Sequence, residues 1–122
     1  CMGPNLQRKM NQQDLVWVKL PFSNLRESKV RPALVVSNDS YNKFNPDIVV
    51  CAITSKLKES AYSVLIENKD LSSGNLPIKS RVRADKIIQI EKEIVIRTFA
   101  KLESKAFDKV INEIINLVKR KD

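Results

Sequence analysis

The stretch KVRPALVVSND, residues 29–39, carries the signature of a buried strand with an unusual start. Ala33 to Ser37 form a short apolar run of the kind that fills the interior of a sheet. In front of it stand Arg31, a charge, and Pro32, which has no backbone N–H to donate. A second run, DIVVCAIT at 47–54, is almost continuously apolar, as expected for a strand covered on both faces. The two runs predict a sheet core with an arginine at its mouth.

Outward from these runs, β-forming residues alternate with turn-forming ones. We expect strands over 14–20, 32–37, 47–54, 62–67, 79–90 and 93–102. We expect loops over 21–30, 55–61 and 68–78, and a turn or short helical segment over 38–46. From Glu103 the apolar residues recur at helical spacing, which predicts an amphipathic helix over 103–119. The fold class is therefore mainly β, a small, twisted, mostly antiparallel barrel-like sheet with a C-terminal helix.

Length and composition indicate one domain and limit the kinds of functional site that the chain could form. The chain has 122 residues, of which 43% are apolar and 30% charged. We expect a single domain over 14–122, preceded by a leader over 1–13 that is in part foreign or without fixed structure, with Met10 as the natural start. The chain has no histidine, and its two cysteines lack metal-ligand spacing, so we expect no metal, no cofactor and no histidine-based triad. Cys51 is expected to be a small buried hydrophobe in a protein of the reducing cytoplasm.

A formal net charge of +8 favours a polyanionic partner, which can be nucleic acid, a membrane surface or an acidic protein. No apolar run is long enough to span a bilayer. Many small basic proteins have no such partner, so the net charge alone does not establish one. The positions of the charged residues have to show whether the protein could bind a polyanion.

The segment KSRVRAD, residues 79–85, places its charges on one side of a strand. Side chains alternate along a strand, so Lys79, Arg81, Arg83 and Asp85 share one face, with Asp85 beside Arg83 as a charge pair and a proton acceptor. Three cations in a row repel unless the face is open to solvent or meets an anion. The alternative is a solvated face with an Arg–Asp bridge that contributes little.

Loops add further cations at Arg26, Lys29, Lys56 and Lys58. Phe22, in a polar loop, is the better candidate for stacking on a base. Trp17, in an apolar strand, is expected to belong to the core.

Five segments, in order, resemble the MazF/PemK-like toxins of type II toxin–antitoxin modules: DLVWVKLPF, RPALVVSND, VVCAITS, KSRVRADKI and FAKLE, followed by the amphipathic helix. The resemblance covers about Asp14 to Val118. It implies an SH3-like barrel that forms a homodimer. It also implies metal-independent, sequence-selective cutting of single-stranded RNA, commonly messenger RNA, and inhibition by a cognate antitoxin in a complex that binds DNA.

The resemblance also implies roles for particular residues. The arginine of the Arg-Pro pair is Arg31, and the threonine at the end of the third strand is Thr54; in the family the two lie together at the active site. Arg83 and Asp85 match an Arg-x-Asp motif whose aspartate is proposed as general base. Because the pKa of arginine is high, we interpret Arg31 and Arg83 as charge stabilisers and leave the general acid unassigned. The hydroxyls of Thr54 and Ser55 are expected on phosphate oxygens.

The chain departs from the family pattern at a few positions. Gln13 replaces the usual glycine, the histidine that some members carry in the first loop is absent, and Lys79 and Arg81 replace residues that are often small or apolar. The two cations are expected to strengthen binding to the RNA backbone and to alter sequence choice. Two alternatives stay open: a gyrase-poison-like toxin directed at a protein, and an inactive module that binds RNA or antitoxin. An arginine that only caps a sheet edge is the structural alternative for Arg31.

Overall fold

The computed structural model describes residues 9–21 and 28–121. The strands are β1 (Asp14–Pro21), β2 (Ser28–Val35), β3 (Asp47–Thr54), β4 (Ser63–Ile66), β5 (Leu71–Gly74), β6 (Ser80–Glu91) and β7 (Val95–Leu102). The helices within these described residues are α1 (Asp39–Phe44) and α2 (Ser104–Val118), together with the 3-10 turns η2 (Asn68–Asp70) and η3 (Lys92–Ile94). Neither α-helix, nor any other helix of the described segments, is long and apolar enough to cross a membrane.

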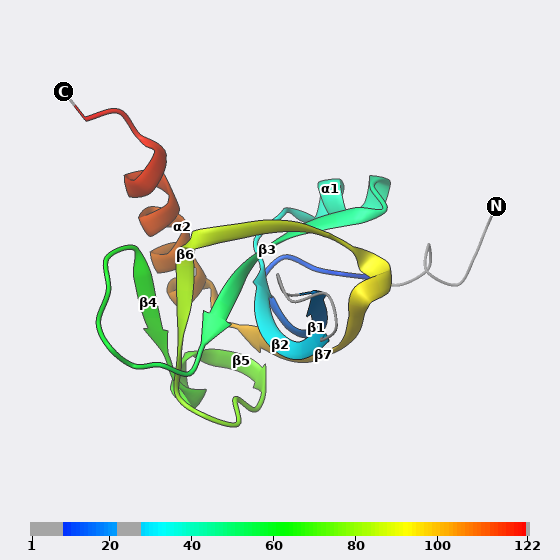
Figure 1. Ribbon diagram of the computed structural model, residues 1–122, viewed down its shortest axis with the longest axis horizontal. Helices are drawn as coiled ribbons and strands as arrows, with labels where there is room; N and C mark the ends of the chain where they lie inside the picture. The colour runs from blue at the N-terminus through cyan, green and yellow to red at the C-terminus, as the bar shows by residue number, and fades with distance from the viewer. Residues whose placement is uncertain (1–8, 22–27, 122) are drawn as a thin grey trace.

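The strands form one antiparallel sheet that curls on itself (Figure 1). Its order is β4-β6-β3-β2-β1-β7-β5, so β4 and β5, neighbours in the chain, lie at opposite edges. The three residues of η2 carry the chain from one edge to the other, and the Glu103 N–H donates to the Asp70 carbonyl to tie that crossing to the start of α2. An open sheet could not bring its two edges this close, so the curl is a half-barrel. The predicted fold class is confirmed.

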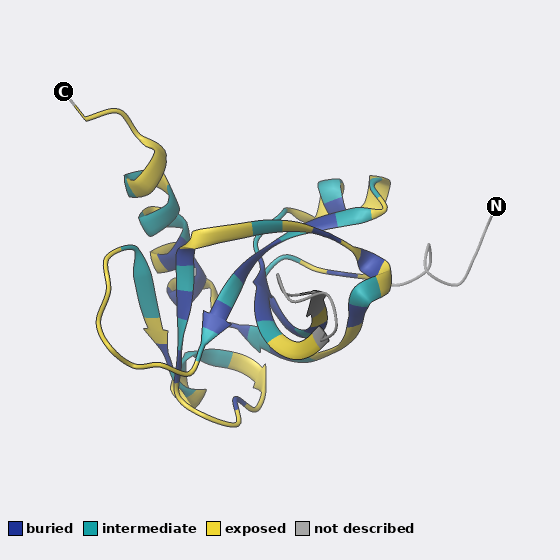
Figure 2. Ribbon diagram, viewed as in Figure 1, coloured by how far each residue is buried: buried dark blue, intermediate teal, exposed yellow. Residues whose placement is uncertain are grey.

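The buried residues of the curled sheet, dark blue in Figure 2, form two apolar clusters, one on each face of the sheet. On the concave face Val16, Val18, Ala33, Val35 and Val50 are fully buried with their neighbours. On the other face a second cluster packs beneath α2, which contributes Ala106, Phe107 and Val110. Strands that bury both faces are expected to be continuously apolar. The run at 47–54 is such a strand, and its predicted bounds are those observed for β3.

Two of the predicted secondary-structure assignments were wrong, one over residues 68–78 and one at the start of the second strand. The segment 68–78, predicted as loop, contains η2 and the strand β5. Leu71-Ser72-Ser73-Gly74 has little strand propensity of its own, and it becomes a strand because it pairs with β7. The second strand begins at Ser28 rather than residue 32, because Ser28 to Val30 pair with β1 although their sequence is polar.

Pro32 lies inside a central strand, yet its missing N–H does not remove a hydrogen bond from the sheet. Trp17 of β1 lies opposite Pro32, whereas the ladder between β2 and β3 runs only from Ala33 to Val35. Pro32 is therefore on the stretch of β2 that has no ladder towards β3, where a missing N–H costs nothing. The Arg-Pro pair marks the point where β2 and β3 separate.

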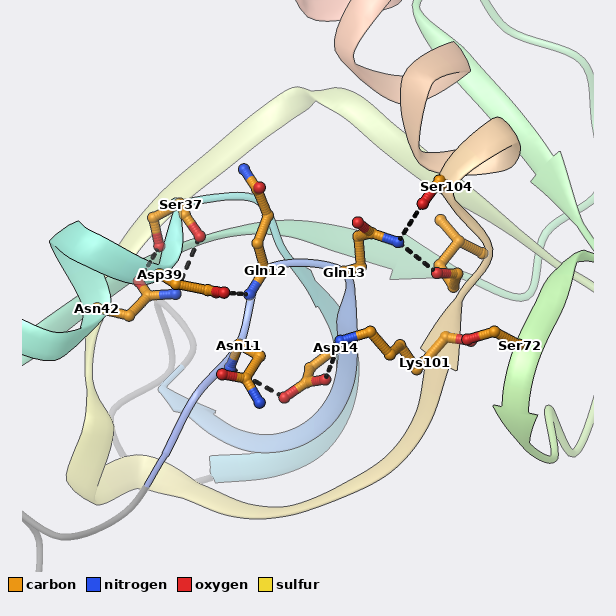
Figure 3. A network of polar contacts seen from close by, with 11 residues as sticks. Asn11, Gln12, Gln13, Asp14, Ser37, Asp39, Asn42, Ser72, Lys101 and Ser104 are labelled. Atoms are coloured by element: carbon orange, nitrogen blue, oxygen red, sulfur yellow. Dashed lines mark hydrogen bonds and ion pairs between the residues drawn. The ribbon is translucent and has the colours of Figure 1, made fainter.

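The residues before β1 are part of the folded structure (Figure 3). Met10 is 6% exposed in the concave core, and Gln13 adopts a φ of 81°, the left-handed conformation that favours glycine. The side-chain amide of Gln13 donates to the Leu102 carbonyl (2.8 Å) and the Ser104 hydroxyl (3.3 Å), joining the turn to β7 and α2. These two bonds offset the backbone strain of a residue that is not glycine.

Candidate functional site

Three strands each place one polar residue on the concave face. Thr54 of β3 lies opposite Arg81 of β6. Ala33 of β2 lies opposite Ala52 of β3, and Arg31, two residues before Ala33 and beyond the end of that ladder, is on the same face of β2 as Ala33. Residues directly opposite one another in antiparallel strands project to the same face. Arg31, Thr54 and Arg81 therefore share the face that buries Ala33 and Val50 further along the same strands.

Arg83 lies on this face too, at the start of an irregularity in β6. Cys51 pairs with Ile87 but Ile53 pairs with Val82, so Ala52 of β3 faces a bulge of four residues, 83–86. Between Lys79 and Ala84 the buried residues are Ser80, Val82 and Ala84, while Lys79, Arg81 and Arg83 face the other way, so the alternation continues into the start of the bulge. The predicted alternation is confirmed for this part of the strand.

Within the bulge, Arg83 and Asp85 form a two-point ion pair. The Nε of Arg83 donates to Oδ1 of Asp85 at 2.8 Å, and Nη2 donates to Oδ2 at 3.0 Å. The hydrogen bond from Arg83 lowers the pKa of Asp85 below its usual value, and the same contact raises the pKa of Arg83. At neutral pH the pair is a carboxylate held by a guanidinium, which suits charge stabilisation better than acid catalysis by Arg83.

Arg31 marks the border between core and solvent. Its neighbours on the same face, Ala33 and Val35, are fully buried, whereas Arg31 and Lys29 are exposed. A phosphate that approached this end of the half-barrel would therefore meet guanidinium groups before it met apolar core. The arrangement can bind an anion without opening the core.

The other predicted cations are dispersed. Lys56 and Lys58 are exposed with Ser55 on the loop after β3, and Lys79 makes an ion pair with Glu67 at 3.5 Å. Phe22 and Arg26 lie outside the described residues. Trp17 was predicted to belong to the core, but it is only partly buried and is in neither core cluster; its ring stacks on Phe99 at a ring-centroid distance of 4.6 Å. Cys51 is fully buried, and burial together with the charge of Asp85 raises its pKa to about 12, which keeps the thiol protonated.

Ser63 contacts Arg81 of this site, and it was not identified from the sequence. It lies opposite Arg83 on β4, and its hydroxyl accepts a hydrogen bond from Nη1 of Arg81 at 3.1 Å. Tyr62, in front of it, adopts a left-handed φ of 59°. Both residues line an open cavity of about 700 Å³ between β4 and α2, with Arg81, Lys109 and Glu113. No local sequence pattern signals this site, because it depends on the placement of β4 against β6 and α2.

Comparison with known proteins gives consistent matches over nearly the whole chain. Residues 11–118 match the family described as PemK-like, MazF-like toxin of type II toxin–antitoxin system. The endoribonuclease EndoA of Bacillus subtilis is 28% identical over 90 residues, which cover 74% of this chain and 77% of that protein. The fold is similar to that in a MazE–MazF crystal structure from Deinococcus radiodurans, with a TM-score of 0.76, 20% identity and coverage of 91% of this chain and 97% of that one. It is also similar to a mycobacterial endoribonuclease in complex with its cognate antitoxin, with a TM-score of 0.74, 17% identity and coverage of 92% and 99%.

Proposed function

The chain belongs to the PemK-like, MazF-like toxins of type II toxin–antitoxin systems, and from that membership we propose that it is a metal-independent, sequence-selective endoribonuclease of single-stranded RNA. The observation that carries the proposal is the placement of Arg31, Thr54, Arg81 and Arg83 on one face of the sheet, next to the point where β2 and β3 separate. The names of its relatives support the same activity, since EndoA of Bacillus subtilis is an endoribonuclease. Messenger RNA is the proposed substrate.

The proposed reaction is attack of a ribose 2′-oxygen on the adjacent phosphate. The 2′-hydroxyl loses its proton as the bond from phosphorus to the 2′-oxygen forms, and the 5′-oxygen takes up a proton as its bond to phosphorus breaks, which leaves a 2′,3′-cyclic phosphate and a 5′-hydroxyl. Arg31 and Arg83 stabilise the charge that develops on the phosphorane, and the hydroxyls of Thr54 and Ser55 bind phosphate oxygens.

Asp85 is the proposed acceptor of the 2′-proton. Both of its oxygens accept hydrogen bonds from Arg83 in the free protein, and its lowered pKa makes it a weak base in that state. A phosphate that draws the guanidinium of Arg83 away would release the carboxylate and raise its basicity. Substrate binding would thus activate the base.

The proposed partners are a cognate antitoxin and a second copy of the chain. The last turns of α2 support a protein contact, because Ile115 is 49% and Val118 70% exposed although both belong to the apolar stripe of the helix. Sedimentation should give a dimer at micromolar concentration, and Val118→Asp should shift it towards the monomer.

A reducing cytoplasm is the proposed location, consistent with the free, buried thiol of Cys51.

The decisive experiment is cleavage of a long single-stranded RNA of mixed sequence in EDTA, followed by analysis of the fragment ends. We expect discrete cuts with 2′,3′-cyclic phosphate and 5′-hydroxyl ends. Arg31→Ala should lower cleavage by about 100-fold or more, as loss of a charge stabiliser does.

Arg97→Ala is the matched control. Arg97 is also an exposed strand arginine, but it lies opposite Trp17, whose side chain leaves the other face of β1 from Val18. It should cleave like the unaltered protein. If the well-folded protein without antitoxin does not cut RNA, the proposal fails, and the exposed end of α2 then favours a toxin directed at a protein.

A further inference from the structure

The loop between β3 and β4, residues 55–61, is fully exposed yet tied down at three points. The Lys56 N–H donates to the hydroxyl of Thr54 at 3.2 Å. The Leu57 carbonyl accepts from Nε of Arg81 at 3.3 Å, and the Ser60 carbonyl accepts from the hydroxyl of Ser63 at 2.7 Å. Three hydrogen bonds therefore fasten this exposed loop, at Lys56, Leu57 and Ser60.

Arg81 connects two of these anchors. Its Nε holds Leu57, and its Nη1 donates to the hydroxyl of Ser63 at 3.1 Å. That hydroxyl also accepts from the hydroxyl of Ser60 at 3.2 Å while it donates to the Ser60 carbonyl, so its one donor and two acceptor positions are all in use. One guanidinium therefore fastens the loop both directly and through Ser63.

The three cations that share this strand face, Lys79, Arg81 and Arg83, differ in the groups that they bind. Lys79 pairs with Glu67, Arg83 pairs with Asp85, and Arg81 holds backbone and hydroxyl groups of the loop. A strip of equivalent phosphate contacts would leave all three cations free to meet RNA. In the observed arrangement the donors of Arg81 that point to the loop are engaged before any RNA arrives.

We propose that Arg81 is a positioning residue that fixes the loop 55–61 and thereby determines where the RNA is cut. This rests on the proposed function. Thr54 stands opposite Arg81 and directly precedes the loop, so the loop is held beside the sheet face that also carries Arg31. Lys56 and Lys58, with the half-exposed Leu57 between them, are then presented at a fixed distance from the reacting phosphate. Fixing these contacts makes one register of the RNA more favourable than its neighbours.

The first test uses the free protein and does not depend on RNA. Hydrogen exchange of the Lys56 amide reports opening of the loop. Loss of one hydrogen bond of this kind corresponds to roughly five- to tenfold faster exchange, and we expect that increase in both Arg81→Gln and Ser63→Ala. Arg81→Lys should exchange as fast as Arg81→Gln, because an ammonium cannot hold Leu57 and Ser63 at the spacing of a guanidinium.

Lys79→Gln is the matched control, since it removes the same charge from the same face without touching the loop. Its Lys56 exchange should be unchanged. Unaltered exchange in Arg81→Gln, or a full rescue by Arg81→Lys, would overturn the proposal.

The second test separates positioning from a phosphate contact. Binding of a single-stranded RNA with 2′-O-methyl groups, which cannot be cut by 2′-attack, is measured over a range of salt. If Arg81 only contacts a phosphate, Arg81→Gln alone lowers the slope of log affinity against log salt by about 0.7. If Arg81 positions the loop, the uncharged change Ser63→Ala has the same effect on binding as Arg81→Gln.

Cleavage of ordinary RNA completes the test. We expect both variants to lower kcat/KM at the preferred site by about tenfold, with a smaller loss at secondary sites, because a misplaced loop relaxes the choice of register. Equal losses at all sites would contradict a role in positioning. If the unaltered protein neither binds nor cuts RNA, the proposed function fails as a whole; if it cuts RNA and the variants keep its site preference, only the role of Arg81 fails.

Discussion

The two halves of β6 make opposite use of the same sheet face. In the first half Arg81 and Arg83 point to the concave side and are partly exposed. In the second half Ile88 and Ile90 point to that side and pack into the concave core. The residues that face the concave side are odd-numbered before the bulge and even-numbered after it.

The bulge opposite Ala52 produces this change. Because side chains alternate with a period of two, an odd number of extra residues in one strand exchanges its two faces relative to its neighbour. One strand can therefore supply core at one end and a charged site at the other. This comparison teaches that the candidate site is an extension of the barrel interior, beginning where the apolar core stops.

The largest expected effect comes from breaking the apolar half. Ile90 is 6% exposed in the concave core and Ile87, three residues earlier, is 41% exposed. We expect Ile90→Ala to lower the free energy of unfolding by about 2–5 kcal/mol and Ile87→Ala by about 1 kcal/mol or less. Urea denaturation of the two variants measures the difference. Equal losses would contradict the assignment of the two faces beyond the bulge.

Breaking the charged half should affect activity with little effect on stability. We expect Arg83→Ala to lower RNA cleavage by about 100-fold, as loss of a charge stabiliser does. Its free energy of unfolding should change by less than about 1 kcal/mol, because the ion pair is solvent-exposed. Lys86→Ala, an exposed cation at the end of the same bulge, is the control and should retain cleavage. A fall in stability comparable to that of Ile90→Ala would place Arg83 in the core instead.

The smallest expected effect is the loss of the contribution that Asp85 makes to stability as the pH falls. The native pKa of Asp85 is lowered, so its contribution to stability is present above its ordinary pKa of 3.8 and disappears as the pH falls through the lower native value. The unaltered protein should therefore be slightly more stable than Asp85→Asn at pH 7, by less than about 1 kcal/mol, and equal to it in strong acid.

A double-mutant cycle isolates this effect. In an Arg83→Gln background, Asp85→Asn should lose most of its dependence on pH, since the hydrogen bond from Arg83 is the largest cause that lowers the pKa of the carboxyl. A pH-dependent difference of unchanged size in that background would assign the shift to another partner.

The sequence by itself determined the features that depend on local periodicity. The apolar run at 47–54 gave β3 at its observed bounds, and the helical spacing after Glu103 gave α2 within a residue at each end. The alternation in KSRVRAD gave the shared face of Lys79, Arg81 and Arg83, because the faces of a strand follow from residue number alone. The pair of Arg83 with Asp85 followed from proximity in the chain.

Only the tertiary structure decided the features that need a distant partner. β5 is a strand because β7 lies beside it, and Ser28 to Val30 are strand because β1 does. The loop 55–61 is held by Arg81, 24 residues after Leu57 in the chain, and no local pattern encodes that contact. Arg31, Thr54 and Arg81 likewise come to share one face only once β2, β3 and β6 are assembled into the sheet. Periodicity fixes the direction of a side chain relative to its own strand, whereas pairing between strands determines what that side chain meets.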